Sequence, residues 1–173
     1  MTYFRHAERH IQFGVEQRVK AILDDCGWLP GSPAVPFGES AVDLVFKRLD
    51  DRELRTVKGN MVAVVFGDRS TDKELELGGS LSEFSTLFWL NVVAERDAVA
   101  LAIASDLIDG LSGRNPAFSR FLPVQDYTST VPVFMPNWRA EFTEIVRQRP
   151  QVTDWRKAWQ VVEVVLAIES VEG

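Results

Sequence analysis

Two histidines near the start of the chain are the side chains whose spacing best suits a metal ion. His6 and His10 are four residues apart, so a helix would place both imidazoles on one face, where they could chelate an ion. The zincin pattern is different, because there the glutamate directly follows the first histidine, whereas Glu8 stands two residues after His6. The chain has no third histidine. We therefore expect structural or solvent-exposed histidines and no metal ligands.

Neighbouring carboxylates are the other candidates for chemistry. Asp24–Asp25 and Asp50–Asp51 could in principle supply an acid–base pair or a magnesium site. Adjacent residues in a loop or at a helix end point in different directions, so we interpret both pairs as solvated charge. The glycines form neither a Walker nor a dinucleotide-binding motif, and the sequence has no Gly-x-Ser-x-Gly elbow. We predict no catalytic, cofactor-binding or metal-binding residues, and no enzyme.

Length and composition predict one ordinary folded domain spanning residues 1–173. The chain is 46% hydrophobic and 25% charged, which is a globular profile. Its net charge of −6 disfavours tight binding to nucleic acid, which requires clustered Lys and Arg. Cys26 is the single cysteine, so an intrachain disulfide is excluded, and we expect a buried helical thiol. We find no signal peptide and no apolar run of about 18 residues, so we expect a protein that stays in the cytoplasm and binds no membrane.

The elements that must position any site are predicted from hydrophobic periodicity. Helical spacing predicts helices, and alternation or valine-rich runs predict strands. The fold class is α+β: one mixed or antiparallel β-sheet with two main α-helices packed on one face, plus an extended arm or hairpin. The expected helices are 3–26 and 98–111, and the expected strands or extended pieces are 41–48, 61–66, 81–95, 121–127, 131–135, 141–147 and 158–169. An apolar helix is the alternative for the last segment.

The unit formed by strand 81–95 and the helix after it gives the most detailed expectations. We expect Asp97 to be the N-cap of that helix and Gly110 or Gly113 to close it. Both faces of the strand are partly apolar, so it should be central, with helices on one face and another cover on the opposite face. A partner subunit is one candidate for that cover.

Two exposed segments are candidates for contacts with other subunits. The charged stretch 50–59 reads as a solvated connection, and 69–80 reads as a half-exposed ribbon arm that could pair with a neighbour. Tryptophans near the end of the chain could pack in the core or could anchor a neighbouring subunit. The predicted subunit or partner contacts are Arg69, Lys73, Glu74, Leu75, Glu76, Leu77, Trp138 and Trp155.

Several stretches resemble the tail terminator proteins of long-tailed bacteriophages. The likeness is one of pattern and order, with a strand that leads through a polar turn into a helix, followed by a proline-bearing extended segment. It covers most of the chain and leaves the loop 27–39 and the arm 69–80 unexplained. The stretches are HAERHIQFGVEQRVKAIL, FSTLFWLNVVAERDAVALAIASDLIDGL, LPVQDYTSTVP and DWRKAWQVVEVVLAIESVE.

The resemblance implies an assembly role at the head-proximal end of a virion tail. It implies a homo-oligomeric ring, commonly a hexamer, that caps the tail tube, stops tube polymerisation and provides the docking surface for the head-to-tail connector protein. No cofactor is implied, and DNA would pass through the lumen without specific binding. An acidic lumen would suit that passage, which agrees with the net charge of −6.

Other functions remain open at this stage. A different head-to-tail adaptor or stopper protein would have a similar composition, and it would bind the portal-side ring without stopping tube growth. A small metal-dependent hydrolase would need clustered acids that hold a divalent ion. A host regulatory or binding domain would behave as a stable monomer.

Overall fold

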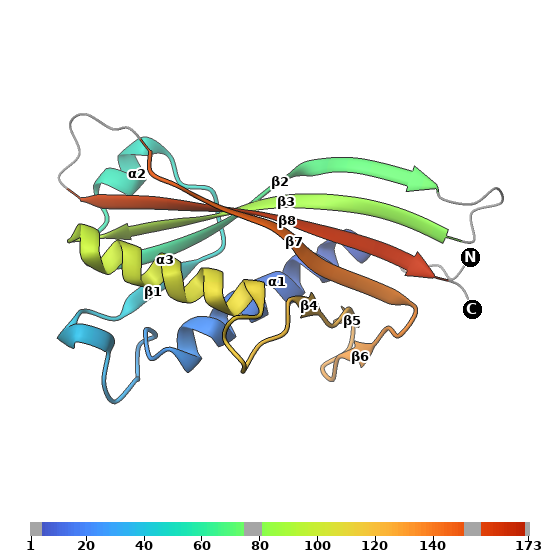
Figure 1. Cartoon of the computed structure of the whole chain (residues 1–173), viewed down its shortest axis with the longest axis horizontal. Coiled ribbons are helices and arrows are strands. Elements are labelled where there is room, and N and C mark those ends of the chain that lie inside the picture. Colours follow the sequence, from blue (N-terminus) through green and yellow to red (C-terminus); the bar gives the residue numbers. More distant parts are fainter. Residues whose placement is uncertain (1–4, 75–80, 151–156, 172–173) are drawn as a thin grey trace.

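The computed structural model describes residues 5–74, 81–150 and 157–171 (Figure 1). None of the helices in these ranges is both long enough and apolar enough to span a lipid bilayer. The helical elements are α1 (Ala7–Asp25), the 3-10 turn η1 (Pro36–Gly38), α2 (Asp51–Arg55) and α3 (Asp97–Ser112). The strands are β1 (Val42–Val45), β2 (Asn60–Glu74), β3 (Leu81–Ala94), β4 (Phe121–Leu122), β5 (Gln125–Asp126), β6 (Val133–Phe134), β7 (Trp138–Gln148) and β8 (Ala158–Val171).

One curled six-stranded sheet organises the chain, in the order β1-β2-β3-β8-β7-β4. β1 and β2 are parallel and every other neighbouring pair is antiparallel, so the sheet is mixed. β5 and β6 form a separate two-stranded hairpin. The predicted α+β class is confirmed, as is the closing strand, which runs from Ala158 to Val171 instead of forming a helix.

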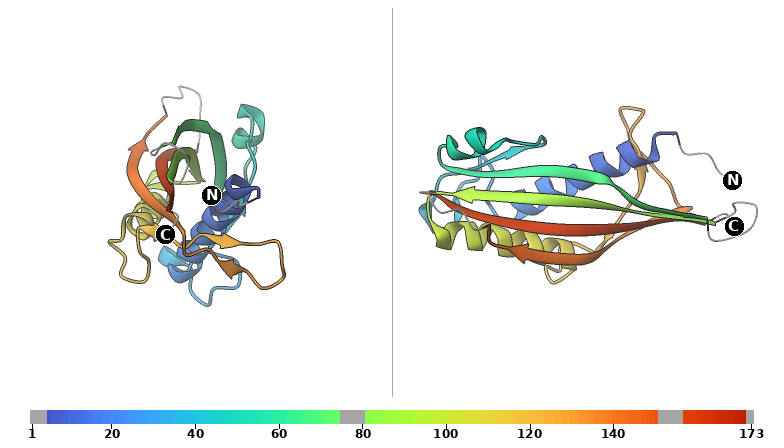
Figure 2. Two further views of the ribbon diagram at one scale, coloured as in Figure 1. Left: turned by 90° about the vertical axis from the view of Figure 1, so that its right-hand side faces the viewer. Right: turned by 90° about the horizontal axis from the view of Figure 1, so that it is seen from above.

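The core lies between one face of the sheet and the two long helices. Figure 2 shows α1 and α3 on the same side of the sheet. Alternate side chains of β3, from Phe84 to Val92, are buried on that side, as the sequence pattern predicts. The matching residues of β8, from Val162 to Ile168, are buried beside them. This face holds most of the large buried side chains.

The two long helices approach each other closely at a glycine. A Cβ atom on Gly110 of α3 would lie 2.6–2.7 Å from three side-chain carbons of Ile22 in α1. Gly110 is therefore a packing residue inside the helix, and Gly113, with φ 85°, is the C-cap. The predicted N-cap is wrong: Arg96 occupies that position, with extended backbone and no capping hydrogen bond from its side chain, and Asp97 is the first helical residue.

Three further boundaries differ from the sequence prediction. β2 does not end at Gly67 but continues to Glu74, with irregularities between Phe66 and Thr71. Gly67 serves a close approach here, because a Cβ atom at this position would lie 2.9 Å from the ring of Trp89. The charged segment 50–59 contains the short helix α2, whose N-terminus is closed by a reciprocal capping box between Asp50 and Glu53. β1 is shorter than the expected strand 41–48.

The loop after α1 is held to the core by Trp28. Its indole ring is fully buried, and its Nε1–H donates a 2.7 Å hydrogen bond to Oδ2 of Asp106 in α3. The backbone N–H of Val42 donates to the carbonyl oxygen of Trp28 at 2.7 Å, which joins this loop to the start of β1. The loop 27–39 is therefore held to the core near its start, and an ion pair between Glu39 and Arg96 holds its end.

Glu16 is a buried carboxyl on α1. Burial raises its pKa, and the positive charge of Arg9, whose Nη1 lies 3.9 Å from Oε1, lowers it to a smaller extent. The raised pKa means that the folded state holds the Glu16 proton more tightly than the unfolded chain does. The ionised form of this residue therefore costs stability at neutral pH.

We predict that Gly110→Ala destabilises the protein through overpacking against Ile22. The added methyl group should lower the free energy of unfolding by about 1–2 kcal/mol, since overpacking costs more than the gain in helix propensity. Urea unfolding measures this change. In an Ile22→Ala background, where the three close carbons are absent, the same substitution should be neutral or stabilising. A stabilising effect of Gly110→Ala with Ile22 intact would contradict this packing.

We predict that Glu16→Gln raises stability at pH 7 and flattens its pH dependence. Between the unfolded and the folded pKa of Glu16, stability falls as pH rises, and the loss is complete above the folded pKa. Glutamine removes that loss. Thermal melts from pH 4 to pH 8 measure how stability changes with pH. Glu8→Gln, in the first turn of the same helix, is the control and should retain the wild-type decrease in stability as pH rises. An unchanged slope in Glu16→Gln would refute the assignment.

Candidate interaction surface

At both edges of the six-stranded sheet, along β2 and along β7, the strands are only partly paired with a neighbouring strand. β1 covers the outer edge of β2 from Asn60 to Ala63, and within the described ranges no strand pairs with the rest of that edge as far as Glu74. β4 covers β7 only opposite Ala140 and Glu141, and no strand in the same ranges pairs with the outer edge of Thr143–Gln148. Such edges present main-chain donors and acceptors in a row, so they can accept a strand from another chain.

Among the described residues, the sheet face turned away from α1 and α3, called the outer face below, is covered only at the end where α2 lies. There Leu54 of α2 packs against Met61 and Val93. Farther along, Val146 of β7 is 49% exposed. Half-buried apolar residues of β3 and β8 continue this part of the outer face, namely Leu87, Trp89, Val161, Val165 and Ala167.

Two tryptophans of the outer face have their indole N–H groups occupied within the chain. Trp89 Nε1–H donates to Oε2 of Glu163 at 3.3 Å, and Trp159 Nε1–H donates to Oδ1 of Asn91 at 3.1 Å. Their rings are therefore fixed while remaining partly accessible. Fixed aromatic rings on an accessible face are typical of protein interfaces, because they bury much area with little loss of entropy.

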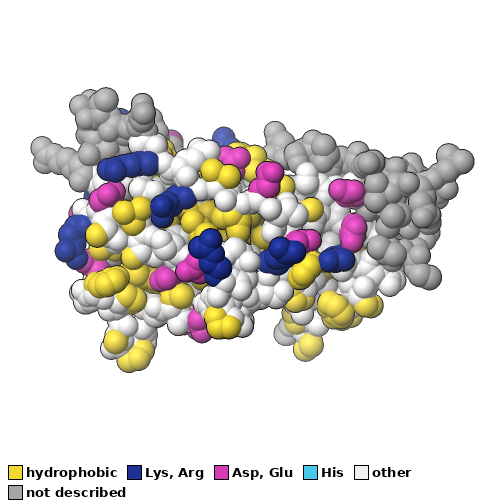
Figure 3. All heavy atoms as spheres, in the orientation of Figure 1, with side chains coloured by type: hydrophobic (Ala, Val, Ile, Leu, Met, Phe, Trp, Pro, Cys, Tyr) yellow, Lys and Arg dark blue, Asp and Glu magenta, His cyan; other side chains and the backbone are white. Residues whose placement is uncertain are grey.

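The β5–β6 hairpin exposes apolar side chains on both of its faces. Val131 is 76% exposed, and Val133 and Phe134 of β6 are 56% exposed each. Figure 3 shows hydrophobic side chains gathered over this hairpin, at the lower right of the view. Such a small ribbon is unstable alone in water, so its apolar exposure favours a role in contact with another molecule.

Beside this hairpin lies an apolar cleft of about 420 Å³, which includes Trp138. The Trp138 ring contacts Phe84 edge to face, with ring centroids 6.4 Å apart, so one side of the indole packs toward the core. Its half-buried position and its contact with Phe84 agree with core packing, and contact with a partner stays a prediction. The cleft is lined by Phe121, Leu122, Pro123, Phe134, Trp138, Arg139 and Ala140.

The remaining predicted contact residues fall into two groups. Arg69, Lys73 and Glu74 lie in β2, where their backbones pair with Thr86, Glu83 and Ser82 of β3. The first part of the predicted arm is therefore a continuation of a long strand. Outside the described residues lie Leu75, Glu76, Leu77 and Trp155. Contact by any of these residues stays a prediction.

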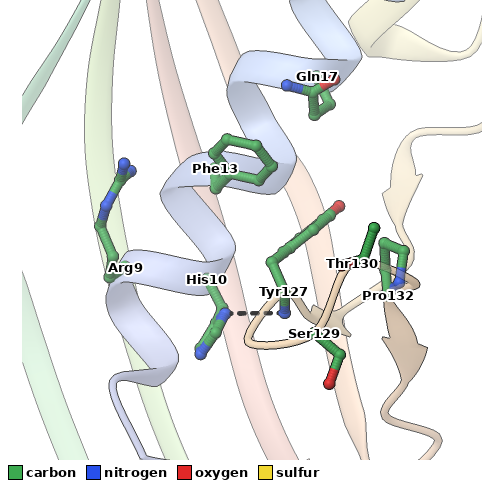
Figure 4. Close-up of a pocket in the computed structure, with 8 residues that line it drawn as sticks. All are labelled: Arg9, His10, Phe13, Gln17, Tyr127, Ser129, Thr130 and Pro132. Atoms are coloured by element: carbon green, nitrogen blue, oxygen red, sulfur yellow. Dashed lines mark hydrogen bonds between the residues drawn. The ribbon is translucent and has the colours of Figure 1, made fainter.

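A second cleft, of about 460 Å³, lies between α1 and the loop 127–132 (Figure 4). Phe13 contacts Tyr127 edge to face, with ring centroids 4.7 Å apart, and the guanidinium of Arg9 lies 5.8 Å from the centre of the Phe13 ring. The backbone N–H of Tyr127 donates a 3.0 Å hydrogen bond to Nδ1 of His10. The lining residues are Arg9, His10, Phe13, Gln17, Tyr127, Ser129, Thr130 and Pro132.

The histidines and acids that could serve chemistry are not gathered into one site. His6 precedes α1 with a left-handed backbone, φ 58°, and accepts a hydrogen bond from Arg5, whereas His10 faces the loop at Tyr127. In the parts of the chain that the structure describes, no three His, Cys, Asp or Glu side chains are grouped so that they could hold a metal ion.

Cys26 is poorly suited to nucleophilic chemistry. Burial raises the pKa of its thiol to about 11, with further contributions from the negative charges of Asp106, Asp25 and Asp109. A thiol with this pKa is almost entirely protonated at neutral pH, and the thiolate is the reactive form. Cys26 is the C-cap of α1 and is half-buried, so the expected buried position inside the helix is met only in part.

The extended pieces expected at 121–127 and 131–135 contain β5 and β6, but sequence reasoning missed the apolar exposure of this hairpin and the cleft beside α1. The run Val131-Pro-Val-Phe-Met-Pro136 contained a usable signal, because prolines at both ends prevent the apolar residues from joining a regular core element. The cleft had no comparable signal. Its two walls are more than 100 residues apart along the chain, and only the fold brings Phe13 to Tyr127.

Comparisons with known proteins give one structural likeness to report. No family model and no curated protein matches the sequence. Among solved structures, a chain from "Virion of native gene transfer agent (GTA) particle" aligns with a TM-score of 0.45 and 12% sequence identity, over 96% of this chain and 98% of that chain. At this level of similarity the likeness identifies neither a family nor a function.

Proposed function

We propose that this chain is a non-enzymatic structural component of a phage-like virion, and specifically a tail terminator. In this role it forms a ring at the head-proximal end of the tail, caps the tail tube, stops tube polymerisation and provides the docking surface for the head connector. The observation that carries the proposal is the pair of incompletely paired edges on opposite sides of one sheet. The resemblance of the sequence to tail terminator proteins supports the specific role.

Opposite edges of one sheet suit a head-to-tail ring. The outer edge of β2 in one copy can pair with the outer edge of β7 in the next, so each copy uses two different surfaces. Heterologous contacts of this kind close into a ring when the rotation between copies is right. The resemblance favours six copies. Arg69, Lys73 and Glu74 lie along the β2 edge and are the predicted contacts that best fit this arrangement.

The outer face supplies apolar area beside those edges. Val146 lies on the open strand β7, and the other apolar residues of the outer face lie on the central strands β3 and β8. A neighbouring copy that overlaps this face in addition to pairing with the edge would cover them. Burial of apolar area is the main source of favourable free energy in association, and strand pairing sets the register. No cofactor or metal enters this role.

The β5–β6 hairpin is the proposed contact with the next ring along the tail axis. Val131, Val133 and Phe134 lie on a separate hairpin outside the six-stranded sheet, so they remain available after the sheet edges are paired. The chain carries a net charge of −6, which suits a lumen through which DNA slides without adhering. A terminator must offer such a contact on one side only, because a second tube-like face would let the tube continue.

We predict that Val146→Lys breaks the ring and that Val131→Lys does not. Lysine at position 146 places a charge beside the open edge of β7, a common natural means of preventing edge pairing. Val131 is 76% exposed and Val146 is 49% exposed, so neither substitution should unfold the chain. Light scattering measures the mass of each variant. The wild type and Val131→Lys should be oligomeric, and Val146→Lys should be monomeric. A wild type that remains monomeric at high concentration would contradict the proposal.

The same pair of variants separates ring formation from capping. Purified protein mixed with polymerising tail-tube protein from the same particle should shorten the tubes seen in negative-stain images. Val131→Lys should form rings that no longer shorten them. If wild-type rings bind a portal-side ring and leave tube length unchanged, the protein is a head-to-tail adaptor instead of a terminator.

A further inference from the structure

The cleft between α1 and the loop 127–132 has the size and make-up of a ligand site, separate from the sheet edges. Its volume of about 460 Å³ falls within the roughly 300–1,000 Å³ typical of pockets that bind small molecules. Figure 4 shows the aromatic ring of Phe13 on the helix side and Tyr127 on the loop side, with Gln17 at one end of the cleft and Ser129 and Thr130 on the loop. Aromatic walls combined with a few polar groups are the usual composition of such pockets.

The described lining of the cleft contains a cation and no acidic side chain, although the carboxylate of Asp126 lies 3.6 Å from Nε2 of His10 at its edge. The sequence has 25 acidic residues, yet no Asp or Glu is among the described residues that line the cleft, and Arg9 contributes a permanent positive charge. The Arg9 side chain is 63% exposed, and its distance of 3.9 Å to Glu16 is too long for a hydrogen bond. Figure 4 shows the Arg9 side chain on the side of Phe13 away from Tyr127, so its guanidinium must swing past Phe13 to donate two parallel hydrogen bonds to an anion in the cleft.

The aromatic wall is held in place before any ligand arrives. The main-chain hydrogen bond from Tyr127 to His10 fixes the loop to α1, and the His10 ring is stacked on Tyr127 with centroids 6.3 Å apart. Asp126 directly precedes Tyr127, and its carboxylate accepts two hydrogen bonds from Thr128, one from the backbone N–H and one from the hydroxyl group. A preformed wall lowers the entropy that binding would otherwise cost.

We propose that this cleft binds a carboxylate carried on an aromatic body, with Arg9 holding the carboxylate and Phe13 and Tyr127 contacting the ring. Two sources share that chemistry: a free aryl acid, and the C-terminal residue of a peptide that ends in an aromatic side chain. Gln17, Ser129 and Thr130 can donate hydrogen bonds to the carboxylate or to the adjoining amide. The site does not depend on ring formation.

The test uses the full chain and N-acetyl-L-phenylalaninate, with N-acetyl-L-phenylalaninamide as the uncharged probe. Titrations followed by amide chemical shifts should show saturable binding of the acid, with shifts at Tyr127 and Thr130, and binding of the amide about tenfold weaker. Arg9→Gln should weaken the acid about tenfold, to the level of the amide, because one charge-assisted contact is lost. Phe13→Ala should weaken both probes.

Arg139→Gln is the matched control. Arg139 also lies over a phenylalanine ring, at 4.6 Å from Phe121, and is also 3.9 Å from a glutamate, Glu169, with 59% of its side chain exposed. Its removal should leave both probes unaffected. Equal losses in the two arginine variants, equal binding of acid and amide, or no binding of the acid would each overturn the proposal.

Two more probes complete the test. Inorganic phosphate that binds at the same residues as tightly as the aryl acid would also overturn the proposal, because the ring would then contribute nothing. A pentapeptide ending in a phenylalanine carboxylate distinguishes the two sources. Binding tighter than that of the free acid supports a peptide terminus, and equal binding supports a free aryl acid.

Discussion

Main-chain hydrogen bonding at the sheet edges is the constraint on which the rest of this account depends. Each residue of a strand presents one N–H and one C=O group, and at an edge these groups must find water or another chain. Here the long strands β2 and β7 extend well beyond the short strands β1 and β4 that partly cover them. The half-buried tryptophans and valines of the outer face lie on the central strands β3 and β8, between the two open edges, so a neighbouring copy would have to overlap this face as well as pair with an edge to cover them.

The sheet face toward α1 and α3 is covered within the chain itself. There α1 and α3 bury alternate residues of β3 and β8, and the contact is close enough that Gly110 fits against Ile22 only because it lacks a side chain. Both faces of β3 thus carry apolar side chains, but the two long helices cover only one of them. That contrast distinguishes the outer face from an ordinary solvated sheet surface, on which polar residues would alternate with the core residues.

Local patterns predicted most of the fold, and long-range packing explains the rest. The strand and helix from Leu81 to Ser112 followed from alternation and helical spacing, which are local properties. Gly67 looked like a strand end, yet it makes room for the ring of Trp89 on the neighbouring strand, a contact invisible in one segment. The capping box at Asp50 and Glu53 was readable but was hidden among mixed charges. The cleft beside Phe13 exists only after folding.

Amide hydrogen exchange at the two open edges tests the central claim most directly. The measurement compares concentrated and diluted protein, residue by residue, along β2 after Ala63 and along Thr143–Gln148 of β7. If these edges pair between copies, their outward-facing amides should exchange slowly in concentrated protein and rapidly after dilution, while amides between β3 and β8 remain unchanged. Equal exchange at both concentrations along both edges would contradict the account.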